Sequence, residues 1–77
     1  MLEKLKADLI NRGYNVTIPA NANYVVVLGY LKANIKYFQA KSKKAKTILN
    51  ELTSQGFKTE AIQDYDGFYD IHVYYKN

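Results

Sequence analysis

The sequence has no cysteine and a single histidine, His72, among its 77 residues. Disulfides and thiolate ligands are therefore excluded, and one histidine leaves too few ligands for a zinc site. The serines are limited to Ser42 and Ser54, and no glycine-rich phosphate-binding loop is present. Because nucleophilic and metal catalysis both lack their usual side chains, we expect a protein that is not an enzyme and that uses no metal or other cofactor.

Long hydrophobic runs are also missing. The longest, Tyr24 to Leu28, is far shorter than the roughly 20 residues of a membrane-spanning helix. The stretch from Met1 to Arg12 alternates charged and apolar side chains, unlike a signal peptide. We therefore expect a soluble, cytoplasmic protein with no membrane contact, and its length predicts a single domain over residues 1–77.

Acidic residues are absent from one part of the chain. Residues 32–46 contain no acid but six lysines, namely Lys32, Lys36, Lys41, Lys43, Lys44 and Lys46. Residues 47–77 instead contain five acidic residues against two lysines, and the formal net charge of the whole chain is +4. A basic segment followed by an acidic one indicates an electrically polarised molecule, with the basic segment suited to a polyanion.

Apolar residues at helical spacing predict two helices. The first stripe ends at Gly13 and comprises Leu2, Leu5, Leu9 and Ile10. The second lies within residues 42–56 and comprises Ala45, Ile48, Leu49 and Leu52. Ser42 is a natural N-cap, because its hydroxyl can accept from free N–H groups of the first turn. Gly13 and Gly56 suit the helix ends, since glycine adopts the left-handed conformation without steric cost.

Five stretches have the composition of strands: Tyr14 to Ile18, Tyr24 to Leu31, Ile35 to Lys41, Phe57 to Gln63 and Phe68 to Tyr75. The second is apolar on both faces and should be central, with the third joined to it as a hairpin. Asp66-Gly67 predicts a hairpin turn between the last two. The fold class is therefore α+β, with order α-β-β-β-α-β-β and two helices on one face of a largely antiparallel four- or five-stranded sheet.

The two halves of the chain align with each other. An offset of 43 residues places Gly13 on Gly56 and also aligns Leu5 with Ile48. This pattern is consistent with a pseudo-repeat of an α-β-β unit. It is equally consistent with two unrelated helix–glycine–strand units, which look alike at this level.

The start of the second helix is the sharpest candidate site. Lysines in a first turn oppose the helix dipole, at a cost of roughly 0.3–1 kcal/mol each. Free N–H groups at the same end attract phosphate or carboxylate. We therefore assign anion binding to Lys41, Lys43, Lys44 and Lys46, with Lys32 and Lys36 extending the patch. The structural alternative is a lysine-rich face that serves solubility alone.

Eight tyrosines and three phenylalanines are more aromatic residues than the core of so short a chain can hold. Alternation in the last strand places Tyr69, Ile71, Val73 and Tyr75 on one side, and Phe68, Asp70, His72 and Tyr74 on the other. With the first set facing the helices, Phe68 and Tyr74 become candidate contacts for unpaired bases or for a protein partner. Asp70, His72 and Tyr74 also share the pattern of an acid–base site, which cross-strand pairing explains equally well.

Between Glu3 and Phe57, a helix and two strands precede Tyr37-Phe38-Gln39-Ala40-Lys41-Ser42, which runs into a second helix. This order resembles the core of restriction-endonuclease-like nucleases and junction resolvases. Those enzymes place an acid at the start of the second strand and a carboxylate-x-Lys motif on the third, and the carboxylates hold Mg²⁺ at the scissile phosphate. Here Asn21 or Asn23, Gln39 and Lys41 occupy the matching positions, and amides bind a hard cation poorly. The resemblance implies at most a disabled relative that still holds nucleic acid.

Two functional hypotheses follow from the sequence. The first is a small non-enzymatic module that binds nucleic acid through the lysine-rich helix start. The second is a small protein-binding inhibitor or adaptor, encoded by a phage or other mobile element, that contacts a host protein through exposed tyrosines. The short length, the Asn/Lys/Tyr bias of an AT-rich genome and the polarised charge favour the second hypothesis, and the six lysines favour the first.

Overall fold

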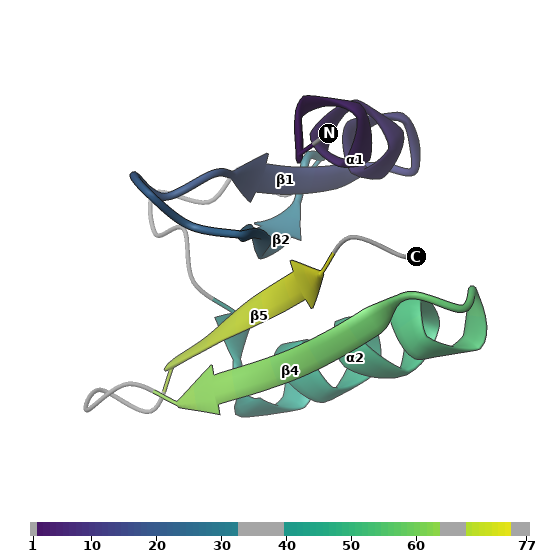
Figure 1. The fold of residues 1–77 in the computed structure, drawn as a ribbon. Coiled ribbons are helices and arrows are strands. Elements are labelled where there is room, and N and C mark those ends of the chain that lie inside the picture. Colours follow the sequence, from purple (N-terminus) through teal and green to yellow (C-terminus); the bar gives the residue numbers. More distant parts are fainter. Residues whose placement is uncertain (1, 33–39, 64–67, 75–77) are drawn as a thin grey trace.

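A computed structural model describes residues 2–32, 40–63 and 68–74 (Figure 1). The elements are α1 (Leu2–Asn11), β1 (Tyr14–Thr17), β2 (Tyr24–Tyr30), β3 (Ala40–Lys41), α2 (Ser42–Ser54), β4 (Lys58–Gln63) and β5 (Phe68–Tyr74). The predicted α+β class is confirmed, with two helices and four main strands in the order α-β-β-α-β-β. Of the additional strand predicted before the second helix, only the two residues of β3 are seen, so that strand is not confirmed. Within the described ranges, no helix is long and apolar enough to cross a membrane.

The strands pair in an antiparallel sheet centred on β5. Four of them follow the order β1-β2-β5-β4, and β4 runs beside β5 from Lys58 opposite Tyr74 to Gln63 opposite Tyr69. On its other side, β5 pairs with β2 at one end and with β3 at the other. The central strand is therefore β5, which bonds to three different strands.

The predicted hairpin between the second and third strands is wrong for the part of the third strand that the structure describes. Ala40 and Lys41 form β3 and pair with Tyr69 and Phe68 of β5, not with β2. The remainder of the predicted strand, residues 35–39, lies outside the described residues, so a full additional strand is not confirmed. The reason for the change of partner lies in β2.

An extra residue in β2 shifts its pairing with β1. Asn15 pairs with Gly29 and Val16 with Val27, which leaves Leu28 without a partner on β1. Such a β-bulge reverses the alternation of side chains and bends the strand. Beyond it, β2 no longer pairs with β5, whose ladder with β2 ends at Val27. The part of β5 that does not pair with β2 pairs with β3 instead. Helix α2 begins at the residue that follows β3.

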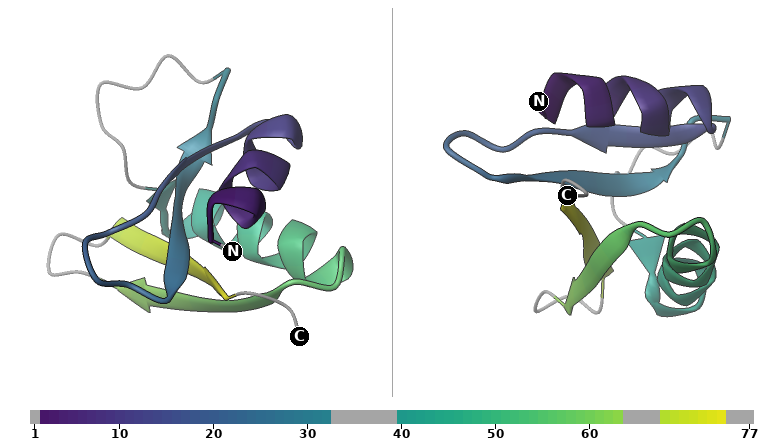
Figure 2. Two further views of the ribbon diagram at one scale, coloured as in Figure 1. Left: turned by 45° about the horizontal axis from the view of Figure 1, so that its top comes forward. Right: turned by 45° about the vertical axis from the view of Figure 1, so that its right-hand side comes forward.

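Both helices pack on one face of the sheet, as predicted, with α1 over β1 and β2 and α2 over β4 and β5 (Figure 2). The core joins both helices to the sheet and consists of Leu5, Leu9, Tyr14, Val25, Val27, Ala45, Ile48, Leu52, Ile71 and Val73. Tyr69 packs against this core, so the predicted helix-facing side of β5 is confirmed. Ile10 is instead 40% exposed and lies outside the core.

The predicted helix ends are confirmed by backbone geometry. Gly13 and Gly56 have φ angles of 97° and 89°, in the left-handed region that favours glycine. After Gly56, the Phe57 N–H donates to the carbonyl oxygen of Leu52 at 3.0 Å, which closes a Schellman-type end. Helix α2 begins at Ser42, but the side chain of Ser42 lies outside the described part, so its capping role stays a prediction.

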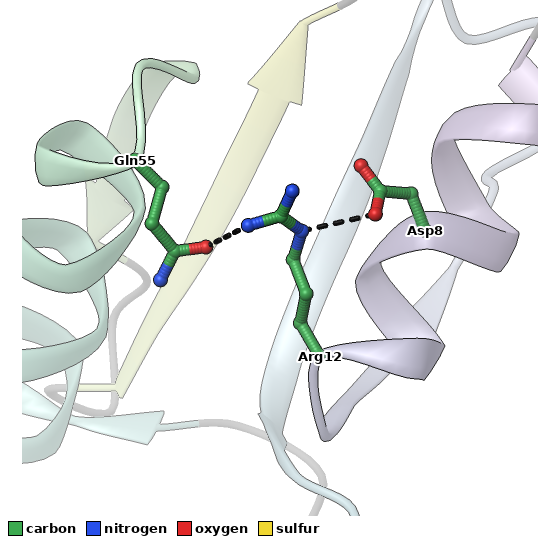
Figure 3. Close-up of polar contacts among 3 residues, drawn as sticks. All are labelled: Asp8, Arg12 and Gln55. Carbon is green, nitrogen blue, oxygen red and sulfur yellow. Dashed lines mark hydrogen bonds and ion pairs between the residues drawn. The ribbon is translucent and has the colours of Figure 1, made fainter.

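Arg12 ties the C-terminal ends of the two helices together (Figure 3). Its Nε donates to Asp8 of α1 at 3.0 Å, and its Nη1 donates to the side-chain oxygen of Gln55, directly after α2. The guanidinium carbon also lies 5.0 Å from the ring centre of Phe57. One side chain therefore bridges the α1–β1 and α2–β4 connections.

The pseudo-repeat is not confirmed. Under the offset of 43 residues, the pair Tyr14 and Tyr30 corresponds to Phe57 and Val73. Tyr14 does pair with Tyr30, but Val73 pairs with Thr59 instead of Phe57. The halves share the order helix, strand, strand, while their strand registers differ.

Two isoleucines on opposite faces test this arrangement. Ile71 is fully buried under the helices, whereas Ile62 is 40% exposed on β4. We expect Ile71→Ala to lower the free energy of unfolding by about 2–5 kcal/mol, because it removes packed methyl groups and leaves a cavity. The matched truncation Ile62→Ala should cost less than about 1 kcal/mol. Urea denaturation of both variants measures the difference, and equal losses would contradict the assignment of faces.

Candidate functional site

The start of α2 carries three exposed lysines, Lys43, Lys44 and Lys46. None of them forms an ion pair with a carboxylate in the part of the chain that the structure describes. The first turn of α2 contains no acidic residue. Positive side chains and the positive end of the helix dipole therefore lie together, as the sequence predicts.

The structure describes only part of the other candidate lysines. Lys32 is exposed and follows Tyr30 of β2 by two residues. Lys41 contributes its backbone to β3, where it pairs with Phe68, but both side chains lie outside the described part. Lys36 lies outside the described residues altogether. The described site therefore rests on the lysines of α2.

The acidic residue of α2, Glu51, is held by two tyrosines. The hydroxyl of Tyr14 donates to Glu51 Oε1 at 2.8 Å, and that of Tyr30 lies 2.9 Å and 3.0 Å from its two carboxylate oxygens. The two rings are stacked, with centres 5.7 Å apart. Tyr30 reaches this position because the bulge at Leu28 turns it to the helix-covered face. The carboxylate is therefore engaged by phenols and not by the lysines.

These contacts change the acidity of the phenols. Burial, the hydrogen bonds to Glu51 and the negative charge of Glu51 together raise the pKa of Tyr14 and of Tyr30 to about 12, and burial is the largest of these causes. An ionised phenolate beside a carboxylate would be repelled. Both tyrosines therefore remain neutral hydrogen-bond donors at neutral pH, and they fasten α2 to the β1–β2 hairpin.

Two hollows flank the start of α2. One is lined by Tyr30, Lys43, Lys44 and Thr47. The other is lined by Lys43, Ala45, Lys46, Leu49, Ala61 and Tyr69. Lys43 borders both, so the three lysines spread across the outer surface of the helix. Each hollow contains one tyrosine beside two lysines, a combination of ring and positive charge.

Tyr74 lies on the opposite face of the sheet, as predicted, but within a cluster and not in an exposed row. Tyr24 stacks on His72 with ring centres 4.1 Å apart, and the Tyr24 and Tyr74 centres are 5.6 Å apart. The Tyr74 hydroxyl donates to Glu60 at 3.2 Å. Desolvation raises the pKa of Tyr74, and the bond to Glu60 raises it further.

The described contacts do not support an acid–base site formed by Asp70, His72 and Tyr74. The contacts of the His72 ring are with the rings of Tyr24 and Tyr74. Across residues 2–32, 40–63 and 68–74, no three His, Cys, Asp or Glu side chains gather in a group that could hold a metal ion. His72 and Tyr74 are therefore held by ring contacts, and Asp70 pairs with Ile62 of β4 in the ladder.

Sequence reasoning missed Tyr24, Tyr30 and Glu51. The position of Tyr30 depends on a bulge that the apolar sequence of β2 does not mark. The contact of Tyr24 with His72 depends on the register between two strands that are far apart in the sequence. Glu51 could have been noticed from the sequence because it is the one acidic residue of the lysine-rich helix α2.

No protein-family model matches this sequence, and no curated protein or solved structure is significantly similar to it. The resemblance to nuclease cores therefore remains an interpretation of a short motif.

Titration of the phenols tests the network around Glu51. In the unaltered protein, ¹³C NMR of the tyrosine Cζ atoms should place the pKa of Tyr14 and Tyr30 near 12. Glu51→Gln should lower both pKa values, because the charge is removed while burial remains. Glu60→Gln is the matched control and should lower only that of Tyr74.

The same shift predicts how stability depends on pH. The folded-state pKa of these tyrosines exceeds the unfolded value of about 10. Their contribution to stability is therefore complete below pH 10 and is lost as the pH rises from about 10 to about 12. Urea denaturation between pH 9 and pH 11 should reveal this decline in the unaltered protein. A Glu51→Gln variant with unchanged Tyr14 and Tyr30 titration would contradict the network.

Proposed function

We propose that this protein binds nucleic acid through Lys43, Lys44 and Lys46 at the start of α2, without catalysing a reaction. The observation that carries the proposal is the absence of a carboxylate partner for these exposed lysines among the described residues. Glu51 belongs to the same helix, yet its oxygens are engaged by Tyr14 and Tyr30. The lysine charges are thus available to phosphate groups.

The position of the lysines on the helix supports the same function. Backbone N–H groups in a first turn favour an anion, and lysines there strengthen the attraction. For folding, these lysines are unfavourable by roughly 0.3–1 kcal/mol each. Side chains that oppose stability at a site complementary to phosphate are best explained by a ligand.

The tyrosines beside the lysines favour nucleic acid over a small anion. Tyr30 shares a hollow with Lys43 and Lys44, and Tyr69 shares another with Lys43 and Lys46. Proteins that hold single strands combine backbone-tracking cations with aromatic rings that contact bases. Lys32, close to Tyr30 in the chain, would extend the track. A cytoplasmic setting, where such a ligand is available, is part of the proposal.

The decisive experiment compares two triple variants with equal charge loss. One carries Lys43→Gln, Lys44→Gln and Lys46→Gln; the control carries Lys4→Gln, Lys6→Gln and Lys58→Gln, on α1 and β4. Affinity for a labelled mixed-sequence single strand is measured over a range of salt concentrations. Each lost phosphate contact should reduce the slope of log affinity against log salt by about 0.7.

We expect the α2 variant to lose up to about two units of slope and most of its affinity. It should also unfold at a slightly higher temperature, because lysines near the positive end of a dipole are removed. The control should retain most of its affinity. Equal weakening of both variants, or no binding by the unaltered protein at low salt, would overturn the proposal.

A further inference from the structure

The two hollows beside the start of α2 have the same chemistry. The Tyr30 hollow has a volume of about 400 Å³ and is lined by Tyr30, Lys43, Lys44 and Thr47. The Tyr69 hollow has a volume of about 380 Å³, and its lining includes Lys43 and Tyr69. Both linings are mainly apolar, and no acid among the described residues lines either hollow. Such volumes lie at the lower end of the range for small-molecule pockets, so each hollow offers apolar surface beside positive charge.

The hydroxyl groups of the Tyr30 hollow are already engaged within the protein. Tyr30 donates to Glu51, and its ring stacks on that of Tyr14. Thr47 donates to the carbonyl oxygen of Lys43 at 3.1 Å, within α2. A ligand in this hollow therefore meets an aromatic ring that is held in place, and lysines without a carboxylate partner among the described residues. This combination suits a ligand with a flat apolar part and a negative charge.

Lys43 connects the two hollows, because it borders both of them. The Tyr30 hollow lies on the β2 side of α2, since Tyr30 belongs to β2. The Tyr69 hollow lies on the side of β4 and β5, since Ala61 and Tyr69 belong to those strands. A ligand that fills both must cross α2 at Lys43. Two flat groups separated by one negative charge match two neighbouring nucleotides, whose bases flank a phosphate.

Given the nucleic-acid binding proposed above, on which this assignment rests, we propose that each hollow receives an unpaired base of a single strand, with the linking phosphate at Lys43. In a duplex the bases are paired and stacked, so only phosphates and groove edges are presented to the protein. Contacts between bases and aromatic rings tolerate any sequence, because every base has a π-face. The lysines thus attract any nucleic acid, and the hollows distinguish an unpaired strand from a duplex.

The test compares three probes of one sequence: a short single strand, the same strand with abasic sites in place of its nucleotides, and the duplex. Fluorescence anisotropy of the labelled probes measures affinity over a range of salt concentrations. We expect the intact strand to bind at least about fivefold more tightly than the abasic strand, the gain from one stacked base. The two strands should show the same slope of log affinity against log salt, because their phosphates are equal in number. Ring-proton NMR signals of Tyr30 and Tyr69 should shift with the intact strand and not with the abasic strand.

Tyr69→Leu removes an aromatic ring from one hollow and keeps an apolar side chain. It should weaken binding of the intact strand at least about fivefold and leave the abasic strand and the duplex within about twofold. Tyr24→Leu, the same change on the opposite face of the sheet, is the matched control and should leave all three affinities within about twofold. The comparison of intact and abasic strands needs no variant, so it keeps the test valid if Tyr69→Leu fails to fold.

The outcomes separate this proposal from the one on which it rests. No binding of any probe at low salt would overturn both. Equal binding of the intact and abasic strands, with a salt slope that the triple lysine variant of α2 reduces, would overturn the base-binding hollows and leave the lysine site supported. Equal weakening of the intact strand by Tyr69→Leu and Tyr24→Leu, or unshifted ring signals, would also overturn the base-binding hollows.

Discussion

The unpaired residue Leu28 in β2 is the constraint from which much of the architecture follows. By adding one residue opposite β1, it turns Tyr30 onto the helix-covered face and directs β2 away from β5. The edge of β5 that is released pairs with β3, and α2 starts at the next residue. The bulge therefore brings Tyr30 beside the first lysines of α2.

Glu51 connects this backbone feature to the charge of the surface. Two phenols from the β1–β2 hairpin engage its carboxylate, which fastens α2 to the first half of the chain. Lys43, Lys44 and Lys46 have no carboxylate partner among the described residues, and Glu51 lies at least five residues from each of them along the helix. Arg12 provides a second link between the halves, at the opposite ends of the helices.

The two faces of the sheet differ in the side chains that they carry. On the helix side, Lys43, Lys44 and Lys46 lie beside Tyr30 and Tyr69, and the first turn of α2 contains no acidic residue. On the open side, Glu60 lies beside Tyr74 in the more acidic half of the chain. The basic part of the polarity seen in the sequence therefore lies at the start of α2.

Much of the fold could be predicted because it depends on local periodicity. The buried stripe of α2, the glycine-ended helices and the helix-facing side of β5 all follow from residue spacing and glycine chemistry. The partner of β3 could not be predicted, because it depends on where β2 leaves β5. The candidate lysines were found from composition, whereas Tyr30 and Tyr24 required the strand register. The periodicity of a sequence shows which side chains of one helix or strand share a face. Which side chains of different strands lie together depends on bulges and on the register between strands that are far apart in the sequence.

The central claim is that the start of α2, and not the open sheet face, contacts nucleic acid. Backbone amide NMR of the unaltered protein during titration with a short single-stranded oligonucleotide tests it directly. We expect shifts concentrated at residues 42–47 and at Tyr30, with Tyr24, His72 and Tyr74 unchanged. Shifts centred on the Tyr24–His72 cluster, with residues 42–47 unaffected, would contradict it.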